Sequence, residues 1–363
     1  MRPNLFDYAT SELSQDAFLL WFLRWSDPQY KDEDLSLHEC SRLFVKRLLG
    51  LDGSLDIETI KVEKQVKHID VFCIVNDEYA VIIEDKTNTS EHGRQMTRYS
   101  KTVETSAKYK HLQKHCIYFK TGNESQQNID TIRNNYIKAN DSTWHFSVMQ
   151  RQDMIDILNH YSGNNVILLD YRDRITRIEK TFLNYLNLPV YEWSWGTWQG
   201  FYKEMETLMD KSEKFWWGTV NSIGGAFVCA AWHKRELKNG QKVKLQMEGY
   251  AAPRKDSRLC VKLEAPQEDE REKMSLLRSY GRELIAAAKE RKLPLTKPKR
   301  YSGKGDVLTL ACAEIGSIIS EEFSISEILN NLQQYQKLLD VFADKHQESS
   351  GGLRSLLGKV FGD

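Results

Sequence analysis

Two apolar runs separated by three polar residues place the strongest constraint on the fold of this chain. The runs are His68–Val75 and Tyr79–Lys86, and Asn76, Asp77 and Glu78 lie between them. Both runs are rich in β-branched and aromatic residues, and the intervening Asn and Asp favour a turn. The stretch therefore predicts a β-hairpin with a three-residue loop, in which Val75 faces Tyr79.

This register brings charged residues together at the open end of the hairpin. It places Asp70 opposite Glu84 and His68 opposite Lys86, while side-chain alternation puts Glu84 and Lys86 on one face and Asp85 on the other. Two carboxylates that face each other across a ladder repel, and a divalent cation such as Mg²⁺ would offset that repulsion. The alternative is a solvated cluster of salt bridges at the end of a strand.

The remaining patterns indicate two domains. Before and after the hairpin we expect helices at 11–25, 35–49, 91–114, 129–139 and 150–158 and extended segments at 56–66, 116–120 and 144–149, which is an α/β order around one mixed sheet. Further on we expect strands within 215–232 and at 242–250, 259–263 and 307–314, with helices at 271–292 and 325–346. We predict a first domain at 1–175, a second α+β domain at 176–348 that binds substrate or a partner, and a flexible joint with a short amphipathic tail at 349–363.

The segments Ile69–Val71 and Ile82–Lys86, in this order of elements, resemble the PD-(D/E)XK nuclease superfamily. The resemblance implies a restriction-endonuclease-like fold for about residues 1–170, and it implies that Asp70 and Glu84 bind Mg²⁺. It also implies that Asp85 contributes its main-chain carbonyl to the metal and that Lys86 assists the attacking water. No proline precedes Asp70, which departs from the full motif.

Two further features extend this resemblance. Gln95 and Tyr99 are four residues apart, on one helix face, and resemble the Q-x-x-x-Y element of bacterial phage-defence branches, which implies that both contact nucleic acid near the metal. Glu12 lies in the first turn of the first helix, on the stripe of Leu19 and Leu23, and the resemblance implies a further metal ligand there. The alternative for Glu12 is a purely electrostatic preference for the helix N-terminus.

Composition restricts the class of protein only weakly. Lys+Arg and Asp+Glu both total 51, so the chain lacks the net positive charge of a non-specific nucleic-acid coat protein. The six cysteines are scattered without a C-x-x-C pair, and no stretch of about 20 apolar residues occurs. We expect reduced thiols, no membrane span and a cytoplasmic location.

A basic segment near residue 300 is a second candidate for contact with phosphates. It contains Lys297, Lys299, Arg300 and Lys304, and prolines at 294 and 298 make most of it a loop. The alternative is an ordinary solvated charge run.

The function that these patterns favour is a Mg²⁺-dependent nuclease, with Mn²⁺ as a substitute and DNA as the favoured substrate. A role in phage defence or restriction, with a homo-oligomer or a partner protein of a defence system, follows from the resemblance alone. One alternative is a catalytically idle nuclease fold that only binds nucleic acid or protein. Another is an enzyme whose activity lies in the C-terminal half, where no nucleophile–base or phosphate-loop motif is evident.

Overall fold

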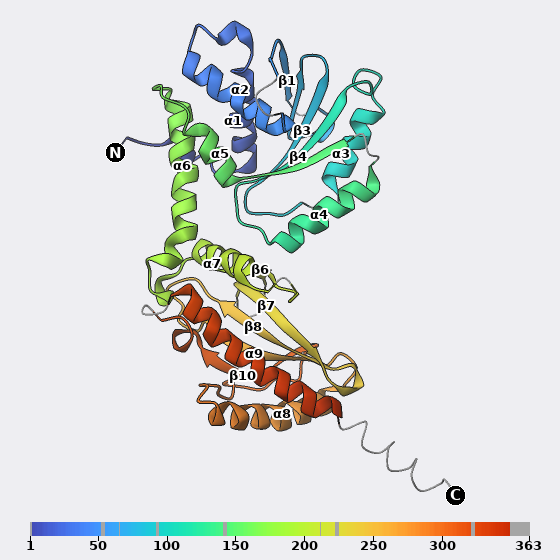
Figure 1. Cartoon of the computed structure of the whole chain (residues 1–363), viewed down its shortest axis with the longest axis vertical. Coiled ribbons are helices and arrows are strands. Elements are labelled where there is room, and N and C mark those ends of the chain that lie inside the picture. Colours follow the sequence, from blue (N-terminus) through green and yellow to red (C-terminus); the bar gives the residue numbers. More distant parts are fainter. Residues whose placement is uncertain are drawn as a thin grey trace, which may run out of the picture. The chain divides into compact units, whose positions relative to one another are not determined.

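The computed structural model describes residues 2–51, 55–64, 66–91, 94–140, 144–210, 212–221, 225–320 and 324–348. The chain divides into two compact units, Met1–Thr181 and Phe182–Asp363. Each unit contains its own five-stranded sheet with helices beside it, as Figure 1 shows. The predicted fold class, a mixed sheet flanked by helices and followed by an α+β domain, is confirmed.

The first unit alternates helices with the strands of one sheet. Its strands are β1 (Ile60–Lys64), β2 (Val71–Val75), β3 (Tyr79–Lys86), β4 (Gln113–Lys120) and β5 (Trp144–Gln150). Its helices are α1 (Glu12–Arg24), α2 (Leu35–Leu49), α3 (Gln95–Glu104), α4 (Gln126–Ala139), α5 (Arg151–Leu158) and α6 (Val166–Leu183), the last of which runs into the start of the second unit. Short 3₁₀ turns lie at Leu5–Asp7, Pro28–Tyr30 and Val66–His68.

The strands follow the order β1-β2-β3-β4-β5, and β3 is the strand at which the sheet changes direction. It is antiparallel to β2 and parallel to β4. Val75 pairs with Tyr79, which confirms the predicted three-residue loop. Within that loop Asn76 and Asp77 have left-handed φ angles of 55° and 51°, a conformation that Asn and Asp tolerate better than most residues.

The two faces of β3 belong to different cores. Ala80 and Ile82 pack with side chains of α3 and α4, whereas Val81 and Ile83 pack with side chains of α1, α2 and α5. Figure 1 shows α3 and α4 beside the sheet, away from α1 and α2. This alternation continues to the end of the strand. Glu84 and Lys86 therefore lie on one face of the sheet and Asp85 on the other, as predicted.

Local signals set several of the predicted boundaries. The side chain of Ser11 caps α1 by accepting a hydrogen bond from the backbone N–H of Ser14, and Asp34 caps α2 in the same way. Gly50 ends α2 with a left-handed φ of 66°, which glycine adopts without a Cβ clash. These two helices were therefore predictable almost to the residue.

Two predictions in this unit were wrong. The helix expected at 91–114 covers only Gln95–Glu104, because Gln113 already belongs to β4 and pairs with Tyr79. His68 does not face Lys86, because it ends a 3₁₀ turn with a φ of 73° and its side chain is exposed. Strand β2 begins three residues later, so the hairpin ladder is shorter than the apolar pattern suggested.

The second unit is an antiparallel sheet with helices packed on one face. Its strands, β6 (Trp216–Val220), β7 (Phe227–Glu236), β8 (Lys242–Gly249), β9 (Arg258–Glu264) and β10 (Val307–Glu314), follow one another in sequence order across the sheet. Its helices are α7 (Trp195–Leu208), α8 (Glu270–Glu290) and α9 (Ile325–Glu348), with 3₁₀ turns at Asn184–Leu186, Val190–Glu192, Lys238–Gly240 and Ile315–Ser317. All three helices contribute to one apolar core with alternate residues of the strands.

The helices and strands of the second unit were also predicted only in part. The segment 215–232 holds two strands, and neither α6 nor α7 was predicted. Both helices nevertheless bury apolar residues at helical spacing, such as Leu168, Tyr171 and Ile175 of α6. The predicted joint and tail at 349–363 lie outside the described residues. Within the described part of the chain, no helix combines the length and the hydropathy needed to cross a bilayer.

Candidate active site

Lys86 lies at the centre of a group of carboxylates at the end of β3. Its Nζ is 2.6 Å from Glu84 Oε1 and 3.9 Å from both Asp70 Oδ2 and Glu12 Oε2. The side chain of Lys86 is 7% exposed and that of Glu84 is 0% exposed, whereas Asp70 and Glu12 are partly accessible. One buried ammonium group thus contacts a fully buried carboxylate and lies near two others that solvent can reach.

The end of the β2–β3 ladder determines which backbone groups reach this cluster. The ladder ends with the pair Val71–Ile83, so the backbone of Asp85 has no strand partner on that side. Its N–H donates a hydrogen bond to the carboxylate of Asp70, and its carbonyl accepts one from Lys86 Nζ at 3.0 Å. The main chain of Asp85 therefore faces Asp70 and Lys86, although its side chain is buried on the other face of the sheet.

Burial dominates the ionisation of the carboxyl groups. It raises the pKa of Glu84 to about 8, with a further contribution from the charge of Asp70, and it also raises the pKa of Asp70. Burial alone would lower the pKa of Lys86, but the neighbouring carboxylates, Glu84 first, outweigh it and the pKa rises. The site thus favours a bound positive charge and disfavours bare negative charge.

The donors in this cluster fit a hard divalent cation. Glu84 Oε2 is buried and receives no hydrogen bond from any described residue, and its carboxyl group lies within hydrogen-bonding reach of Asp70. Carboxylate and carbonyl oxygens are the ligands that Mg²⁺ prefers. As the side chains stand, no three His, Cys, Asp or Glu side chains of the described residues surround an open cation position. We attribute this to the ammonium group of Lys86, which already lies among the carboxylates.

Glu12 is held beside the cluster by the residues that follow β3. Its Oε1 accepts hydrogen bonds from the backbone N–H of Thr87 at 3.0 Å and from the hydroxyl of Thr89 at 2.9 Å. Burial alone would raise the pKa of Glu12, but these hydrogen bonds and the charge of Lys86 outweigh it and the pKa falls. The carboxylate of Glu12 therefore lies beside the cluster around Lys86.

Gln95 and Tyr99 of α3 also approach the cluster. Gln95 Nε2 lies 3.4 Å from the hydroxyl of Tyr99, which is a long hydrogen bond. Burial, together with the charges of Glu84 and Asp70, raises the pKa of Tyr99 to about 12. The structure therefore places both residues of the Q-x-x-x-Y element on the side of the sheet that carries Glu84 and Lys86.

A comparison with protein families assigns this half of the chain. The model of the PD-(D/E)XK nuclease superfamily matches residues 3–188, which is slightly more than half of the chain. The chain belongs to the PD-(D/E)XK nuclease superfamily. No curated protein and no solved structure gives a significant match. Members of the superfamily are generally metal-dependent nucleases, and the cluster around Lys86 lies within the matched region.

A second layer of residues beneath the site of this nuclease-superfamily chain was not predicted from the sequence. Gln15 donates hydrogen bonds to the carboxylate of Asp85 and to Thr121, and it accepts one from Tyr171 at 3.1 Å. The carboxyl group of Asp16 lies within hydrogen-bonding distance of that of Asp85. Burial, together with the charge of Asp70, raises the pKa of Asp16 to about 7. Asp16 lies four residues after Glu12 on α1, and this spacing was the available signal.

Lys120 is a second missed residue. It ends β4 and pairs with Lys86 in the parallel register, so the two lysines lie at the same edge of the sheet. Its Nζ donates to the carbonyl of Thr89 and lies 4.0 Å from Glu124 Oε2, and burial lowers its pKa. An apolar strand that ends in a lysine, parallel to the E-x-K strand, could have identified it.

The predicted phosphate-binding residues Lys297, Lys299, Arg300 and Lys304 belong to the second unit. All four are exposed, and Lys297 Nζ lies 5.1 Å from the centre of the Tyr301 ring. They are accessible, as contact with phosphates requires.

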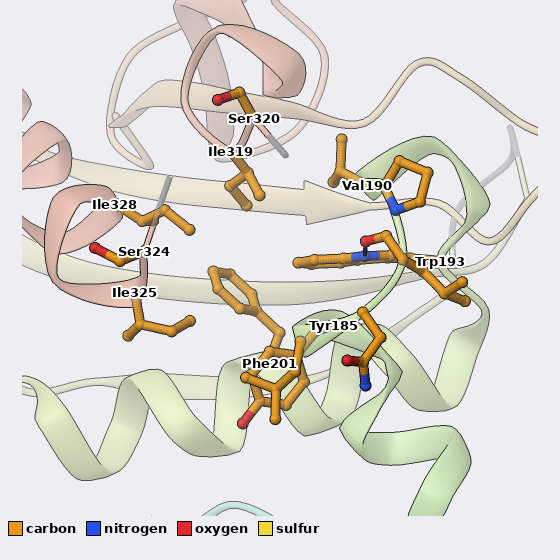
Figure 2. A pocket seen from close by; sticks show the side chains of 13 residues that line it. Tyr185, Val190, Trp193, Phe201, Ile319, Ser320, Ser324, Ile325 and Ile328 are labelled. Atoms are coloured by element: carbon orange, nitrogen blue, oxygen red, sulfur yellow. Dashed lines mark hydrogen bonds between the residues drawn. The ribbon is translucent and has the colours of Figure 1, made fainter. Parts of the chain in front are cut away.

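The second unit also contains a pocket lined mostly by apolar side chains, which Figure 2 shows from close by. Trp193, Phe201, Ile325 and Ile328 are among its lining residues, and Trp193 and Phe201 also belong to the core of this unit. None of the described lining residues is an Asp, Glu, His, Lys or Cys. The pocket therefore gives no support to the alternative of an active site in the C-terminal half.

Proposed function

We propose that this chain is a Mg²⁺-dependent nuclease that hydrolyses phosphodiester bonds, with DNA as the favoured substrate. The observation that carries the proposal is the cluster of Asp70, Glu84 and Lys86, in which an ammonium group lies among carboxylates at the end of a central strand. A stability role alone does not account for it, because a fully buried carboxylate beside a second carboxylate costs free energy. Such an arrangement is expected where a metal ion and a phosphate bind.

Each residue of the cluster has a proposed role in metal binding or in hydrolysis. Asp70, Glu84 and the carbonyl of Asp85 would hold Mg²⁺, or Mn²⁺ in its place, and Glu12 would supply a further carboxylate. When bound, the ion supplies Lewis-acid stabilisation of the scissile phosphate and a bound water of lowered pKa. Lys86 remains protonated and donates hydrogen bonds to the attacking water or to a phosphate oxygen.

Gln95 and Tyr99 are proposed to position the nucleic-acid strand. Tyr99 is neutral at physiological pH, and burial raises its pKa further, so its hydroxyl can donate a hydrogen bond to a phosphate oxygen. The amide of Gln95 adds a second donor from the same helix face. Both residues lie on the face that carries Lys86, which supports this assignment.

The broader parts of the proposal rest on the resemblance and on composition. We infer a role in phage defence or restriction, a cytoplasmic location, and assembly as a homo-oligomer or with a partner protein of a defence system. The predicted second domain, residues 176–348, would bind substrate or that partner. Lys297, Lys299, Arg300 and Lys304 would contact phosphates from its surface.

A cleavage assay tests the proposal directly. Purified full-length protein is incubated with supercoiled, linear and single-stranded DNA, and with RNA, in Mg²⁺, Mn²⁺ or EDTA. The test variants are Asp70→Ala and Lys86→Ala. Matched controls are Asp77→Ala and Lys61→Ala, which remove an exposed ion pair between the hairpin loop and β1, away from the cluster.

We expect cleavage in Mg²⁺ by the wild type and by both controls, and none by the Asp70 or Lys86 variant or in EDTA. Loss of a group that acts in the transition state lowers the rate by about 10² to 10⁴. Cleavage that persists in either test variant, or in EDTA, would refute the site. Binding of nucleic acid without cleavage of any substrate would instead favour a catalytically idle binding module.

A further inference from the structure

Helix α8 of the second unit carries a row of cations on its solvent face. Arg271, Arg278, Arg282 and Lys289 are all exposed. At about 100° per residue these four positions fall within about 40° of one another around the helix axis, and they extend over about 27 Å. The buried residues of α8, such as Leu277 and Leu284, lie on the opposite side and pack in the core.

The acidic residues of α8 do not neutralise this row. Glu283 faces α9, where it pairs with Lys345 at 2.7 Å and with His346 at 3.2 Å. Glu272 closes the capping box at the start of the helix by accepting a hydrogen bond from the backbone N–H of Asp269. On the helical wheel Glu272 and Glu283, together with Glu290, lie about 100° to 120° from the row, on one flank.

The guanidinium groups of the row have no carboxylate partner in the described part of the chain. No Asp or Glu of the described residues lies within 4.0 Å of Arg271, Arg278 or Arg282. All three line a shallow surface hollow, where Glu270 is the one acidic side chain among the described lining residues. An arginine row without paired carboxylates keeps its donors available for an anionic partner.

The basic loop that follows α8 runs back along the other flank of this row. The hydroxyl of Tyr301 lies against Gly281, and Gly303 lies against Glu270 and Met274. Lys273 Nζ fixes the loop by donating a hydrogen bond to the carbonyl of Gly305 at 3.0 Å. The loop therefore lies on the side of α8 that faces away from the acidic flank.

We propose that the α8 row and this loop form one phosphate-binding surface, which binds the backbone of nucleic acid. We define the α8–loop surface as Arg271, Arg278, Arg282 and Lys289 of the helix with Lys297, Lys299, Arg300 and Lys304 of the loop. The inference rests on the proposed nuclease function for the choice of nucleic acid as the partner. It goes further because it assigns a contact with nucleic acid to α8, a helix of the second unit that carries no recognised motif.

The chemistry of the surface favours nucleic acid over a membrane. A helix that lies on a bilayer inserts an apolar face between the lipids, but the apolar face of α8 is packed in the core of the unit. No large hydrophobic side chain of α8 or of residues 291–305 is exposed. Cationic side chains along about 27 Å match the closely spaced phosphates of a duplex, which carries a charge about every 3.4 Å on each strand.

Salt dependence measures how many of these cations meet phosphates. Each phosphate neutralised on duplex DNA contributes about 0.9 to the slope of the logarithm of the binding constant against the logarithm of the salt concentration. If Arg278 and Arg282 each neutralise one phosphate, their joint removal lowers the magnitude of that slope by about 2.

The experiment measures binding without cleavage. The full-length protein in EDTA is titrated into a fluorescein-labelled DNA duplex, and anisotropy gives the dissociation constant between about 50 and about 200 mM KCl. The test variant is the double substitution Arg278→Ala/Arg282→Ala. The matched control is Lys238→Ala/Lys337→Ala, which removes two exposed cations from other parts of the same unit. Thermal melting checks that both variants remain folded.

We expect the test variant to bind at least about tenfold more weakly than the wild type, with a slope lower by about 2, while the control stays near the wild type. An unchanged slope and affinity in the test variant, or no binding by the wild type, would overturn the inference. Vesicles of phosphatidylserine and phosphatidylcholine form a second arm. Vesicle binding that the same double substitution abolishes, without DNA binding, would assign the surface to a membrane.

The outcomes also separate this inference from the proposed function. Mg²⁺-dependent cleavage that needs Lys86, together with unaltered DNA binding by the test variant, would support the nuclease function and refute the α8–loop surface. Salt-sensitive binding that depends on Arg278 and Arg282, without cleavage of any substrate, would support the α8–loop surface and refute the nuclease function.

Discussion

Replacing Glu84 with glutamine should make the metal-free protein more stable, and increasingly so as the pH rises. Glu84 is 0% exposed, and burial together with the charge of Asp70 raises its pKa from 4.5 to about 8. In the unfolded chain the same carboxyl ionises near 4.5. Between these two values the unfolded state has released a proton that the folded state retains, so the folded state loses stability relative to the unfolded state as the pH rises.

The size of the effect follows from the two pKa values. One pKa unit corresponds to about 1.36 kcal/mol, so a carboxyl with a pKa of about 8 in place of 4.5 destabilises the fold by at most about 5 kcal/mol at high pH. Glutamine keeps the shape of the side chain and cannot ionise, which removes this penalty. Because Lys86 loses a charged partner, we expect a net gain of about 3 kcal/mol near pH 8 and of less than about 1 kcal/mol near pH 5.

Urea denaturation of the wild type and of Glu84→Gln, followed by tryptophan fluorescence in EDTA at several pH values, measures the difference. Glu63→Gln on β1 is the matched control. Burial opposes ionisation of Glu63, but hydrogen bonds from Lys108 and Tyr109 outweigh it and lower its pKa. This control should therefore lose stability above about pH 4.5 instead of gaining it.

Bound metal should nearly cancel the difference between Glu84→Gln and the wild type near pH 8. Mg²⁺ at about 100 times its dissociation constant should stabilise the wild type by about 2.7 kcal/mol, and it should not stabilise Glu84→Gln. In EDTA, lower stability of Glu84→Gln than of the wild type near pH 8, or a difference between them that does not change with pH, would refute this account.

Two further substitutions test the packing and the electrostatics of the second unit. Gly249→Ala would place a Cβ 2.3 Å from the buried indole of Trp198, so we expect the unit to lose about 1–3 kcal/mol of unfolding free energy, and an unchanged urea midpoint would contradict this. Lys262→Met removes the 2.7 Å partner of Glu248, which is 3% exposed and whose pKa is lowered against burial by Lys262 and a neighbouring arginine. We expect a loss of about 2 kcal/mol at neutral pH that fades below about pH 4.5, where Glu248 protonates in the unfolded chain. Lys244→Met, whose carboxylate partner is more exposed, should cost less, and equal losses would count against the argument.

The centre of the site could be predicted because it depends on local rules. The turn residues between β2 and β3 set the loop length, the loop length set the register, and strand alternation then placed Glu84 and Lys86 on one face. Each step involves residues near one another in sequence, so each could be derived without the rest of the fold. The register of the structure confirms the loop and the pairing up to Val71 and Ile83.

The hydrogen bonds that hold the site from beneath could not be derived from the sequence in this way. Tyr171 reaches Gln15 across 156 positions of sequence, and Gln15 reaches Asp85 across 70. Such contacts depend on how α1 and α6 cross the sheet, which no local pattern encodes. The same reason explains the helix that was expected to continue to residue 114, because pairing of Gln113 with Tyr79 overrides the helical pattern.

The early end of the β2–β3 ladder has a consequence for amide hydrogen exchange. The amides of Glu84 and Lys86 point toward β4, whose pairing with β3 continues to Lys120, so they should exchange slowly in D₂O. The amide of Asp85 points toward β2, and its hydrogen-bond acceptor is the partly accessible carboxylate of Asp70. It should exchange faster than its two neighbours, and its rate should respond to any cation that engages Asp70. One amide in the middle of the E-x-K segment would thus report occupancy of the site without any measurement of cleavage.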